Sequence, residues 1–462
     1  MLLPVASGYR QLLGYFMDGD KWFSDEKVIQ KSKKAYAHFD LRTNVMKARK
    51  YITNPDKIKY HGFYPFIKYV MEYDHFHKVN GELKFDTKKR PICYSAHIDR
   101  CIYQYYSALL NEKYNLRLKH DRINNVPVAY RTDFHCNNID IFKQVVDFIN
   151  EHPSCYVMIG DFTKFFERID HQYLKKQLCN LLEVKRLKPD YYAVFKSITQ
   201  YSTWNLDDIL KLNNLKDTRE NRRKLNSKSR VLPVSVFKAN RNHIKRNDSG
   251  KGIPEGSAIS ACLANIYMLE IDKRINDFVK KHDGFYRRYS DDFIIILPTR
   301  NKTFDHMNHI IKLFNDYHDE GLLKLQPNKT QIFKLDGQGN LDNIGHLFEP
   351  RLNELKHNIN FLGFSFNGKH VTLRGKTISK YNYRKRHKAI GIAYHYTKEK
   401  GFQGSDKLYM LYSERGEHGK GNFLTYVHRV KKEFPDDPVD APIKNNMVKI
   451  RRTLKKYQAK NK

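Results

Sequence analysis

Cysteine is scarce in this sequence, and the few cysteines are scattered. Only six occur in 462 residues, and no two of them form a Cys-x-x-Cys pair. This distribution excludes zinc ribbons, and it excludes the disulfide framework that stabilises many small secreted proteins. We therefore expect a protein of a reducing compartment.

Long hydrophobic runs are also missing. The N-terminal segment Met1-Leu2-Leu3-Pro4-Val5-Ala6 has no basic start, and its apolar run is too short for a signal peptide. No window of the sequence is apolar over the length that is needed to cross a bilayer. These features predict a soluble, cytoplasmic protein without a membrane partner.

Acidic residues are few relative to basic ones. The chain has 50 Asp and Glu against 84 Lys and Arg, which gives a formal net charge of +34. So large an excess indicates a polyanionic partner, and nucleic acid is the commonest one. Hydrophobic residues make up 40% and aromatic residues 13% of the chain, which excludes a disordered basic tail and argues against a histone-like protein.

The most informative segment is Tyr289-Ser290-Asp291-Asp292, which lies between the apolar runs 285–286 and 293–297. This pattern predicts a β-hairpin whose tip carries both carboxylates out of the sheet, where they can hold divalent cations. Taken alone, the Asp pair also fits a solvated turn. Partners elsewhere in the chain decide between the two interpretations.

Asp161 is the best candidate for a third carboxylate. It follows the apolar run 155–160, which suits a buried strand, and a charge at the end of such a strand is costly unless it is paired or bound to a metal. Asp170 fits a different role, the N-cap of a helix over residues 173–178.

A glycine turn and a helical segment lie between these acidic sites. The turn is Gly252-Ile253-Pro254-Glu255-Gly256, and apolar residues of 259–267 recur on one helical face. A glycine turn that opens a helix lets the backbone approach a nucleotide or a template strand closely. The plain alternative is a loop that leads into a helix.

These segments follow one another as the palm motifs do in reverse transcriptases, a family that the sequence resembles over about residues 85 to 375. Five motifs in order are far more specific than any one of them. Weaker matches upstream, which include 89–92, 95–100 and 128–131, look like the fingers motifs of bacterial group II intron-like enzymes. The palm matches are Asp161, the turn at Gly256, Asp291-Asp292, Leu325-Gln326-Pro327-Asn328-Lys329-Thr330 and Phe361-Leu362-Gly363-Phe364.

The resemblance implies an α+β fold of the right-hand polymerase type, with fingers, a palm built on an antiparallel sheet, and a helical thumb. We expect an N-terminal extension over residues 1–84, fingers and palm over 85–375, and a basic helical thumb or C-terminal region over 376–462. A basic insertion at about 203–250 holds 12 Lys and Arg against 5 Asp and Glu. It is either a solvated loop or a segment that binds a structured RNA or a neighbouring subunit.

In this family a primer 3′-hydroxyl attacks the α-phosphate of a deoxynucleoside triphosphate, and pyrophosphate leaves. The resemblance implies metal binding by Asp161, Asp291 and the backbone carbonyl of Phe162, and it gives Asp292 the role of a ligand or of a neighbour that orients the site. The ion is Mg²⁺, with Mn²⁺ as the alternative. Lys329 matches the lysine that assists the departing pyrophosphate.

Phe166 bears on the choice of sugar. It lies five positions after Asp161, where reverse transcriptases place an aromatic gate against the ribose 2′-hydroxyl. A bulky ring there favours deoxynucleotides and a DNA product. The alternative is a Phe packed in the core beside Phe165.

Other positions are matched to substrate and primer. Arg90 and Arg131 are expected to hold triphosphate oxygens, because guanidinium groups suit them. Glu255 stands where the family usually has Gln, and its charge would repel phosphate unless it faces a sugar, a metal or an Arg. The remaining contacts implied by the resemblance are Gly256 and Ser257 under the nucleotide or template, and Leu362 and Gly363 in the primer grip.

The domain content looks most like the stand-alone, defence-associated reverse transcriptases of bacteria. The region after residue 380 is too small for an RNase H or integrase module, and Val371-Thr372-Leu373 departs from the Val-Thr-Gly signature of retrons. We expect an RNA-directed DNA polymerase that copies a structured noncoding RNA in antiphage defence, with a homo-oligomer left open. The alternatives are a reverse transcriptase with another role and a non-catalytic RNA-binding protein. Ser290 and Phe166 speak against an RNA-dependent RNA polymerase.

Overall fold

The computed structural model describes residues 19–79, 82–131, 133–350, 352, 356–397, 399, 401–416 and 421–459. The apolar start of the chain, Met1 to Ala6, lies outside the described residues. The chain divides into two compact units. The first holds residues 1–133, 163–274 and 315–324, and the second holds 134–162, 275–314 and 325–462.

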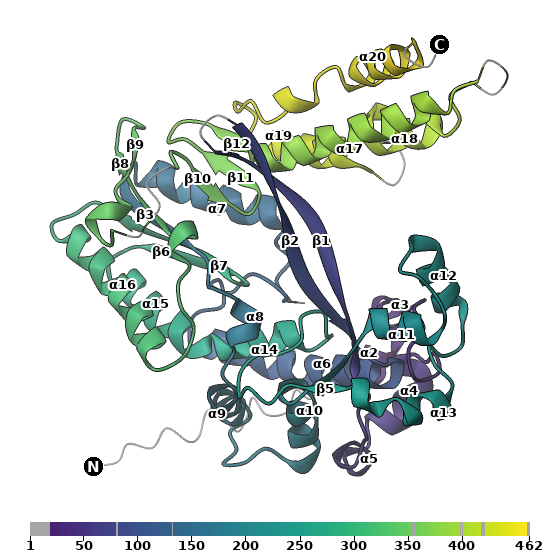
Figure 1. The fold of residues 1–462 in the computed structure, drawn as a ribbon. Coiled ribbons are helices and arrows are strands. Elements are labelled where there is room, and N and C mark those ends of the chain that lie inside the picture. The colour runs from purple at the N-terminus through teal and green to yellow at the C-terminus, as the bar shows by residue number, and fades with distance from the viewer. Residues whose placement is uncertain are drawn as a thin grey trace, which may run out of the picture. The chain divides into compact units, whose positions relative to one another are not determined.

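The second unit is built on a five-stranded antiparallel sheet in the order β6-β7-β3-β8-β9 (Figure 1). The apolar run that precedes Asp161 forms its central strand, β3, as the sequence predicts. The strands of the sheet and two helices that pack on it are β3 (Ser154–Gly160), β6 (Phe285–Tyr289), β7 (Asp292–Pro298), β8 (Gln331–Asp336), β9 (Leu341–Asn343), α7 (Asn138–Glu151) and α16 (Thr303–Asp319).

Helices α7 and α16 cover opposite faces of this sheet. The ring centroids of Phe148 in α7 and Phe285 in β6 are 5.2 Å apart, and those of Phe314 in α16 and Phe293 in β7 are 4.9 Å apart. Phe285 pairs with Ile296, and successive residues of β7 point to opposite faces. Phe285 and Phe293 therefore lie on different faces, and the sheet is covered on both.

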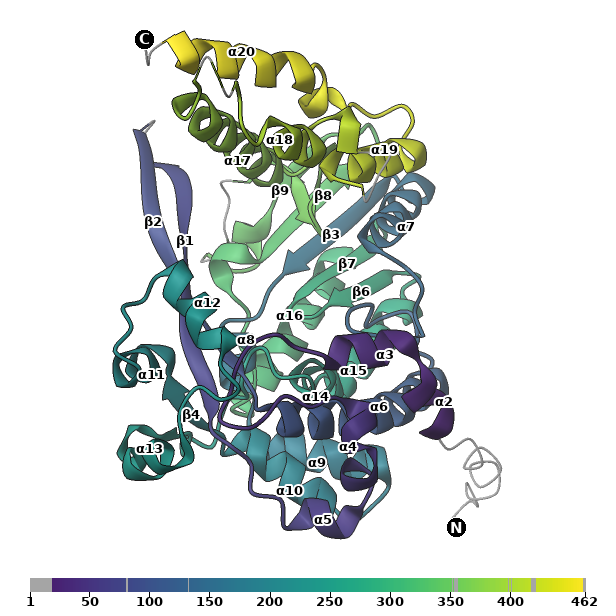
Figure 2. The same ribbon diagram turned by 90° about the vertical axis from the view of Figure 1, so that its right-hand side faces the viewer.

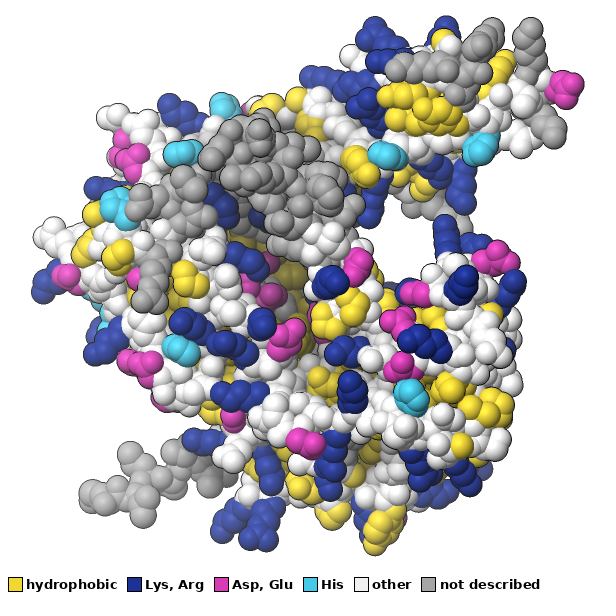
Figure 3. All heavy atoms as spheres, viewed as in Figure 1, with side chains coloured by type: hydrophobic (Ala, Val, Ile, Leu, Met, Phe, Trp, Pro, Cys, Tyr) yellow, Lys and Arg dark blue, Asp and Glu magenta, His cyan; other side chains and the backbone are white. Residues whose placement is uncertain are grey.

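The C-terminal part of the second unit is a small antiparallel sheet followed by helices. Ala389, Ala393, Leu408, Ile450 and Leu454 form the buried core of the helices. Figure 3 shows Lys and Arg side chains over these helices, with hydrophobic side chains between them. The elements are β10 (Ile359–Phe361), β11 (Phe364–Phe366), β12 (Val371–Leu373), α17 (Gly375–Tyr394), α18 (Ser405–Tyr412), α19 (Phe423–Glu433) and α20 (Asn446–Ala459).

The first unit combines helices with a sheet in the order β2-β1-β4-β5 (Figure 2). Its longest strands form the β1–β2 hairpin, and the expected boundary at residue 84 lies inside β2. Its strands are β1 (Phe66–Val79), β2 (Glu82–Tyr94), β4 (Ser202–Asn205) and β5 (Lys245–Arg246). Its helices are α2 (Gly19–Ser24), α3 (Glu26–Ser32), α4 (Val45–Ile52), α5 (Pro55–Lys59), α6 (His97–His120), α8 (Phe165–Arg168), α9 (His171–Leu182), α10 (Pro189–Thr199), α11 (Leu206–Leu212), α12 (Arg219–Ser227), α13 (Val234–Ala239), α14 (Ser260–Tyr267) and α15 (Leu269–Lys281), the last of which continues into the second unit.

The basic insertion is a folded part of the first unit, so the solvated-loop interpretation is wrong. Strand β4 runs parallel to β1, and Trp204 in β4 is fully buried. The Trp204 ring packs on Phe39 at a centroid distance of 5.2 Å. The insertion and the N-terminal extension thus share a core, to which Ala37, Ile67, Ile209, Leu225 and Val231 also belong.

The expected fold class and the expected role of Asp170 are confirmed. The fold is of the α+β class and contains an antiparallel sheet that carries the acidic motifs. Asp170 caps α9 by accepting a hydrogen bond of 2.9 Å from the backbone N–H of Tyr173. Within the described residues, we find no helix whose length and hydrophobicity would let it cross a membrane.

Candidate active site

The neighbouring carboxylates lie at the tip of the β6–β7 hairpin, as the sequence predicts. Tyr289 pairs with Asp292, so Ser290 and Asp291 form a two-residue turn. Ser290 has a φ of 60°, and the buried Arg288 guanidinium donates a hydrogen bond of 2.8 Å to its carbonyl oxygen. Because positive φ in a short turn matches the twist of the two strands, the backbone at Ser290 suits a hairpin that carries both Asp residues at its tip.

Strand register brings Asp161 to the same end of the sheet. Gly160 pairs with Phe293, so the next residue, Asp161, lies beside the start of β7 where Asp292 is. A Cβ at Gly160 would lie 2.4 Å from the Phe293 ring, so the close approach of the two strands requires glycine. The Asp161 carbonyl oxygen accepts a hydrogen bond of 2.8 Å from the Gln326 N–H, which also holds the 325–330 segment at this edge.

The Asp161 carboxylate is mostly enclosed. The residue is 6% exposed, and its Oδ1 is buried without a hydrogen-bond partner among the described residues. Its Oδ2 accepts a hydrogen bond from the ammonium group of Lys329. The structure therefore joins two residues that the sequence nominates from motifs far apart in the chain.

Burial is the main influence on the pKa of two of these carboxylates, and repulsion between the carboxylates adds to it. Burial raises the pKa of Asp161, the hydrogen bond from Lys329 lowers it, and the charge of Asp291 raises it again. Burial, followed by the charges of Asp291 and Asp161, raises the pKa of Asp292 to about 7. Asp292 is nonetheless exposed at the first position of β7, so its carboxyl group is crowded by protein yet open to an ion. A cation relieves such repulsion.

The donor set fits a hard divalent cation. Carboxylate oxygens are the ligands that Mg²⁺ and Mn²⁺ prefer, and the unpartnered Oδ1 of Asp161 offers a free acceptor. In the part of the chain that the structure describes, no three His, Cys, Asp or Glu side chains are already grouped as metal ligands. A bound cation would draw the carboxylates together, and it would compete with Lys329 for the Asp161 carboxylate.

Phe162, the expected source of a carbonyl ligand, anchors the segment that follows β3. Its buried ring lies 5.8 Å from the rings of both Phe293 and Phe314. Its backbone pairs with Leu325 in an isolated bridge. These contacts fix the backbone immediately after Asp161.

Leu362 and Gly363 form a two-residue turn between β10 and β11, with φ values of 48° and 93°. The side-chain amide of Asn138 donates to the Leu362 carbonyl oxygen at 3.1 Å and to the Tyr426 hydroxyl oxygen at 2.9 Å. Asn138 and Tyr426 thus hold the turn in place. Sequence reasoning missed both, because the contact joins positions 288 residues apart and neither lies in a motif.

In the first unit, the segment that carries Phe166 is bonded to the glycine turn. The Phe166 carbonyl oxygen accepts a hydrogen bond of 2.9 Å from the Ile253 N–H, and the Gly252 N–H donates to the Ile169 carbonyl oxygen at 2.8 Å. Phe166 is half-buried, whereas Phe165 is only 4% exposed. The Phe166 ring thus keeps surface that a nucleotide could contact.

Gly256 occupies a position that only glycine fits. Its φ is 105°, and a Cβ there would lie 2.5 Å from the Cys93 carbonyl oxygen. The Cys93 N–H also donates a hydrogen bond of 2.9 Å to the Glu255 carbonyl oxygen. Next to the turn, Ser257 Oγ is buried and has no hydrogen-bond partner among the described residues.

Glu255 faces an arginine, which resolves the conflict that its charge raises in the sequence. Its carboxylate accepts a hydrogen bond from the guanidinium of Arg90 in β2. The Arg90 side chain is 54% exposed, so it can contact a ligand while it neutralises Glu255. The pair also connects the fingers motif to the glycine turn.

Arg131 has a different environment from Arg90. Its side chain is fully buried, and its guanidinium donates hydrogen bonds of 2.7 Å to both Asn124 Oδ1 and Asp133 Oδ2. A further bond goes to the Pro127 carbonyl oxygen at 3.4 Å. In this conformation Arg131 stabilises its own loop.

Residues 82–366 match the family described as reverse transcriptase (RNA-dependent DNA polymerase). That match covers more than half of the chain. The chain belongs to the reverse transcriptase family. It is thereby classed with RNA-directed DNA polymerases, which are nucleotidyltransferases. No curated protein matches the chain.

Several solved polymerase structures are similar to this reverse transcriptase, although their sequence identity to it is low. Apo telomerase from Candida tropicalis, truncated from its C-terminal domain, is 12% identical with a TM-score of 0.41, over 67% of this chain and 57% of that chain. Telomerase from Candida albicans with a fragment of telomeric RNA is 13% identical with a TM-score of 0.36, over 90% and 61%. The Sicinivirus RNA-dependent RNA polymerase is 11% identical with a TM-score of 0.38, over 88% and 71%. The chain thus spans less than two thirds of the length of these two telomerases.

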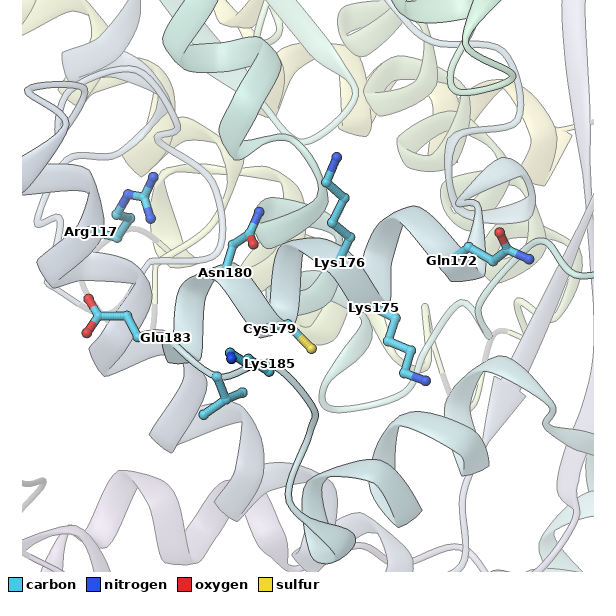
Figure 4. Close-up of a pocket in the computed structure, with 9 residues that line it drawn as sticks. Arg117, Gln172, Lys175, Lys176, Cys179, Asn180, Glu183 and Lys185 are labelled. Atoms are coloured by element: carbon cyan, nitrogen blue, oxygen red, sulfur yellow. The ribbon is translucent and has the colours of Figure 1, made fainter. Parts of the chain in front are cut away.

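A wide depression of about 880 Å³ in the first unit is lined by α6, α9 and the segment after α9 (Figure 4). Its lining is basic, with Arg117, Lys175, Lys176 and Lys185 against the single acid Glu183. Figure 4 shows Lys175 and Lys176 pointing in different directions from α9. None of the site residues nominated from the sequence lines it, so it is not the candidate active site.

Proposed function

We propose that this chain synthesises DNA on an RNA template by nucleotidyl transfer. The observation that carries the proposal is the gathering of Asp161, Asp291 and Asp292 at one end of the antiparallel sheet, with Lys329 in contact with Asp161. Membership of the reverse transcriptase family supports the same activity. The Asp161 and Asp292 carboxylates would hold Mg²⁺ or Mn²⁺ together with Asp291 and the Phe162 carbonyl.

Bound cations would lower the pKa of the primer 3′-hydroxyl and neutralise charge on the leaving pyrophosphate. The chain's own residues supply position and protons. The carboxylates hold the reacting groups in line at the hairpin tip. Lys329, whose side chain is 55% exposed, leaves Asp161 and donates to the departing pyrophosphate.

Substrate selection falls to residues of the first unit. The half-buried Phe166 ring would exclude a 2′-hydroxyl, and the exposed Arg90 guanidinium would bind triphosphate oxygens. Gly256 and Ser257 would lie under the nucleotide or template. In the second unit, Leu362 with Gly363 would position the primer end. In this scheme residues 85–375 act as fingers and palm, and 376–462 as the thumb.

We further infer a structured noncoding RNA as template and antiphage defence in the bacterial cytoplasm as the setting. The net charge of +34 and the folded basic insertion favour an RNA partner. The defence role rests on the resemblance to stand-alone bacterial enzymes. A protein that only binds RNA would not need three acidic residues at one end of a sheet, so catalysis is the better account.

The test compares nucleic acid copurified with the wild type and with an Asp291→Asn, Asp292→Asn variant from cells. We expect DNA complementary to one bound RNA with the wild type, and the RNA alone with the variant. Identical nucleic acid from both proteins would mean that the chain binds RNA without copying it. Binding of one discrete RNA by both proteins is the control for folding of the variant.

A further inference from the structure

A cavity of about 320 Å³ lies within the first unit, where strand β2, the glycine turn and the basic insertion meet. Residues from six separate stretches of the chain line it, among them Tyr36, Tyr69, Tyr94, Arg222 and Gly256. Six stretches that converge on one small cavity make a formed site, not a gap in a loop. No site residue nominated from the sequence, apart from Gly256, belongs to it.

Three tyrosines give the cavity aromatic walls. The Tyr94 ring lies edge-on to Tyr36, at a centroid distance of 4.8 Å, and to Tyr69, at 6.1 Å. All three are half-buried, so each ring keeps accessible surface. The Tyr36 hydroxyl donates a hydrogen bond of 2.9 Å to the Ser95 carbonyl oxygen, which fixes its ring. Rigid aromatic faces of this kind suit a planar ligand.

The insertion contributes a cation and an amide. The Arg222 guanidinium is held by Asp217 through hydrogen bonds of 2.5 and 2.7 Å, and it lies 5.8 Å from the Tyr69 ring centroid. Asn226 Oδ1 accepts a hydrogen bond of 3.1 Å from the Ala37 N–H. The Asn226 Nδ2 donates to no group among the described residues, so an amide donor remains for a ligand.

The glycine turn forms the remaining wall. Gly256 approaches the Cys93 backbone so closely that any Cβ would clash with it, and both residues line the cavity. The cavity therefore adjoins the turn that we propose to lie under the nucleotide or template. A strand of nucleic acid that passes this turn would reach the tyrosines directly.

We propose that this pocket binds an unstacked nucleobase of single-stranded RNA. Aromatic rings stack on any base, a guanidinium adds cation–π and phosphate contacts, and an amide donor meets base acceptors. The insertion holds 12 Lys and Arg against 5 Asp and Glu, and this excess of positive charge attracts the phosphate backbone of RNA. A peptide ligand has no such polyanionic backbone. The proposal rests on the proposed function only in taking RNA as the partner. It assigns a role in RNA binding to the insertion.

The test measures how a single-stranded RNA that carries one 2-aminopurine binds to the full chain. EDTA is present, so that polymerisation does not contribute to the signal. Tyr69→Ala should weaken binding about 5- to 150-fold, the range for loss of one base–aromatic stack. It should also abolish the quenching of 2-aminopurine, and it should leave affinity for an RNA duplex unchanged. Tyr69→Phe should behave as the wild type.

Two neighbouring arginines of α12 separate the effect of the pocket from the effect of lost charge. Arg222→Ala should weaken single-strand binding and quenching, whereas Arg223→Ala, an equal loss of charge at an exposed position outside the pocket, should leave quenching intact. Unchanged affinity of Tyr69→Ala, or an equal loss for single strand and duplex, would overturn the proposal.

Cross-linking of the wild type removes any dependence on variant folding. With 4-thiouridine RNA, we expect cross-links in peptides that contain Tyr36, Tyr69 or Tyr94, and cross-links confined to other peptides would overturn the proposal. The Asp291→Asn, Asp292→Asn variant should bind and quench as the wild type does. Base binding without polymerase activity in the wild type would then contradict the proposed function alone.

Discussion

Phe165 and Phe166 are adjacent in sequence but differ in burial. This difference predicts that Phe165 packs in the core and that Phe166 selects the sugar of the nucleotide. Phe166→Ala should raise ribonucleotide incorporation about 10- to 200-fold relative to deoxynucleotides, because a hydroxyl-sized clash is removed. Primer extension with matched triphosphates measures this ratio. Folding should change little, because the ring is only half-buried.

Phe165→Ala is the matched control at the neighbouring position. Phe165 is 4% exposed, so its truncation should lower the free energy of unfolding by about 3–5 kcal/mol and leave sugar selection unchanged in the protein that remains folded. If Phe166→Ala destabilises the protein as strongly and keeps sugar discrimination, Phe166 is a core residue.

Gly256 tests the backbone of the glycine turn. Gly256→Ala should lower the free energy of unfolding by about 1–3 kcal/mol, because its φ of 105° disfavours a side chain and a Cβ would meet the Cys93 backbone. Urea denaturation measures the change. Gly62→Ala is the control, since no atom lies within 4 Å of a Cβ there, and a loss of similar size at Gly62 would contradict this explanation.

Within the C-terminal helices, Lys385 of α17 carries a buried ammonium group. It donates hydrogen bonds to Asn446 at 2.5 Å and Asn382 at 2.9 Å, both neutral acceptors. Burial, and then the charge of Lys449, lowers the pKa of Lys385 to about 8 from the ordinary 10.5. Between these two pH values the unfolded chain binds one more proton than the folded chain, so this group makes stability rise with pH.

Lys385→Met should remove that dependence. We expect the free energy of unfolding of the wild type to gain, relative to the variant, up to about 1.4 kcal/mol per pH unit between roughly pH 8 and 10. Denaturant titrations of both proteins across this range measure the difference in their free energies of unfolding. The ionisation of the tyrosines contributes equally to both proteins, so it cancels in this difference. Parallel pH profiles would show that Lys385 keeps its ordinary pKa in the folded protein.

Elements differ in how far the sequence predicts them. The β6–β7 hairpin and β3 are predictable, because apolar runs and a two-residue turn are local signals. The order of the motifs along the chain then nominates Asp161 and Lys329, which the structure joins. The core of the insertion is not predictable in this way, because Trp204 packs on Phe39, which precedes it by more than 160 residues.

The same limit applies to the surroundings of single side chains. Arg90 and Arg131 fit a phosphate clamp equally well by residue type. The structure distinguishes them, since Arg90 is exposed beside Glu255 and Arg131 is enclosed by Asn124 and Asp133. Burial and partners are set by contacts across the chain, which no local pattern reports.

For the molecule as a whole, the net charge of +34 predicts that RNA binding depends strongly on salt. Residues 381–462 contribute 20 Lys and Arg against 8 Asp and Glu, and Arg452 and Lys456 of α20 are exposed. If α20 contacts the phosphate backbone, each lost contact should reduce the slope of log affinity against log salt by about 0.7 for single strands.

Arg452→Gln with Lys456→Gln should therefore weaken binding of all RNA sequences alike and lower the salt slope by up to about 1.4. Anisotropy titrations at several salt concentrations measure the slope. The control, Lys280→Gln with Lys281→Gln, removes the same charge from exposed positions at the end of α15 and should leave the slope unchanged. Equal slopes for both double variants would mean that net charge alone attracts RNA, and that α20 makes no phosphate contact of its own.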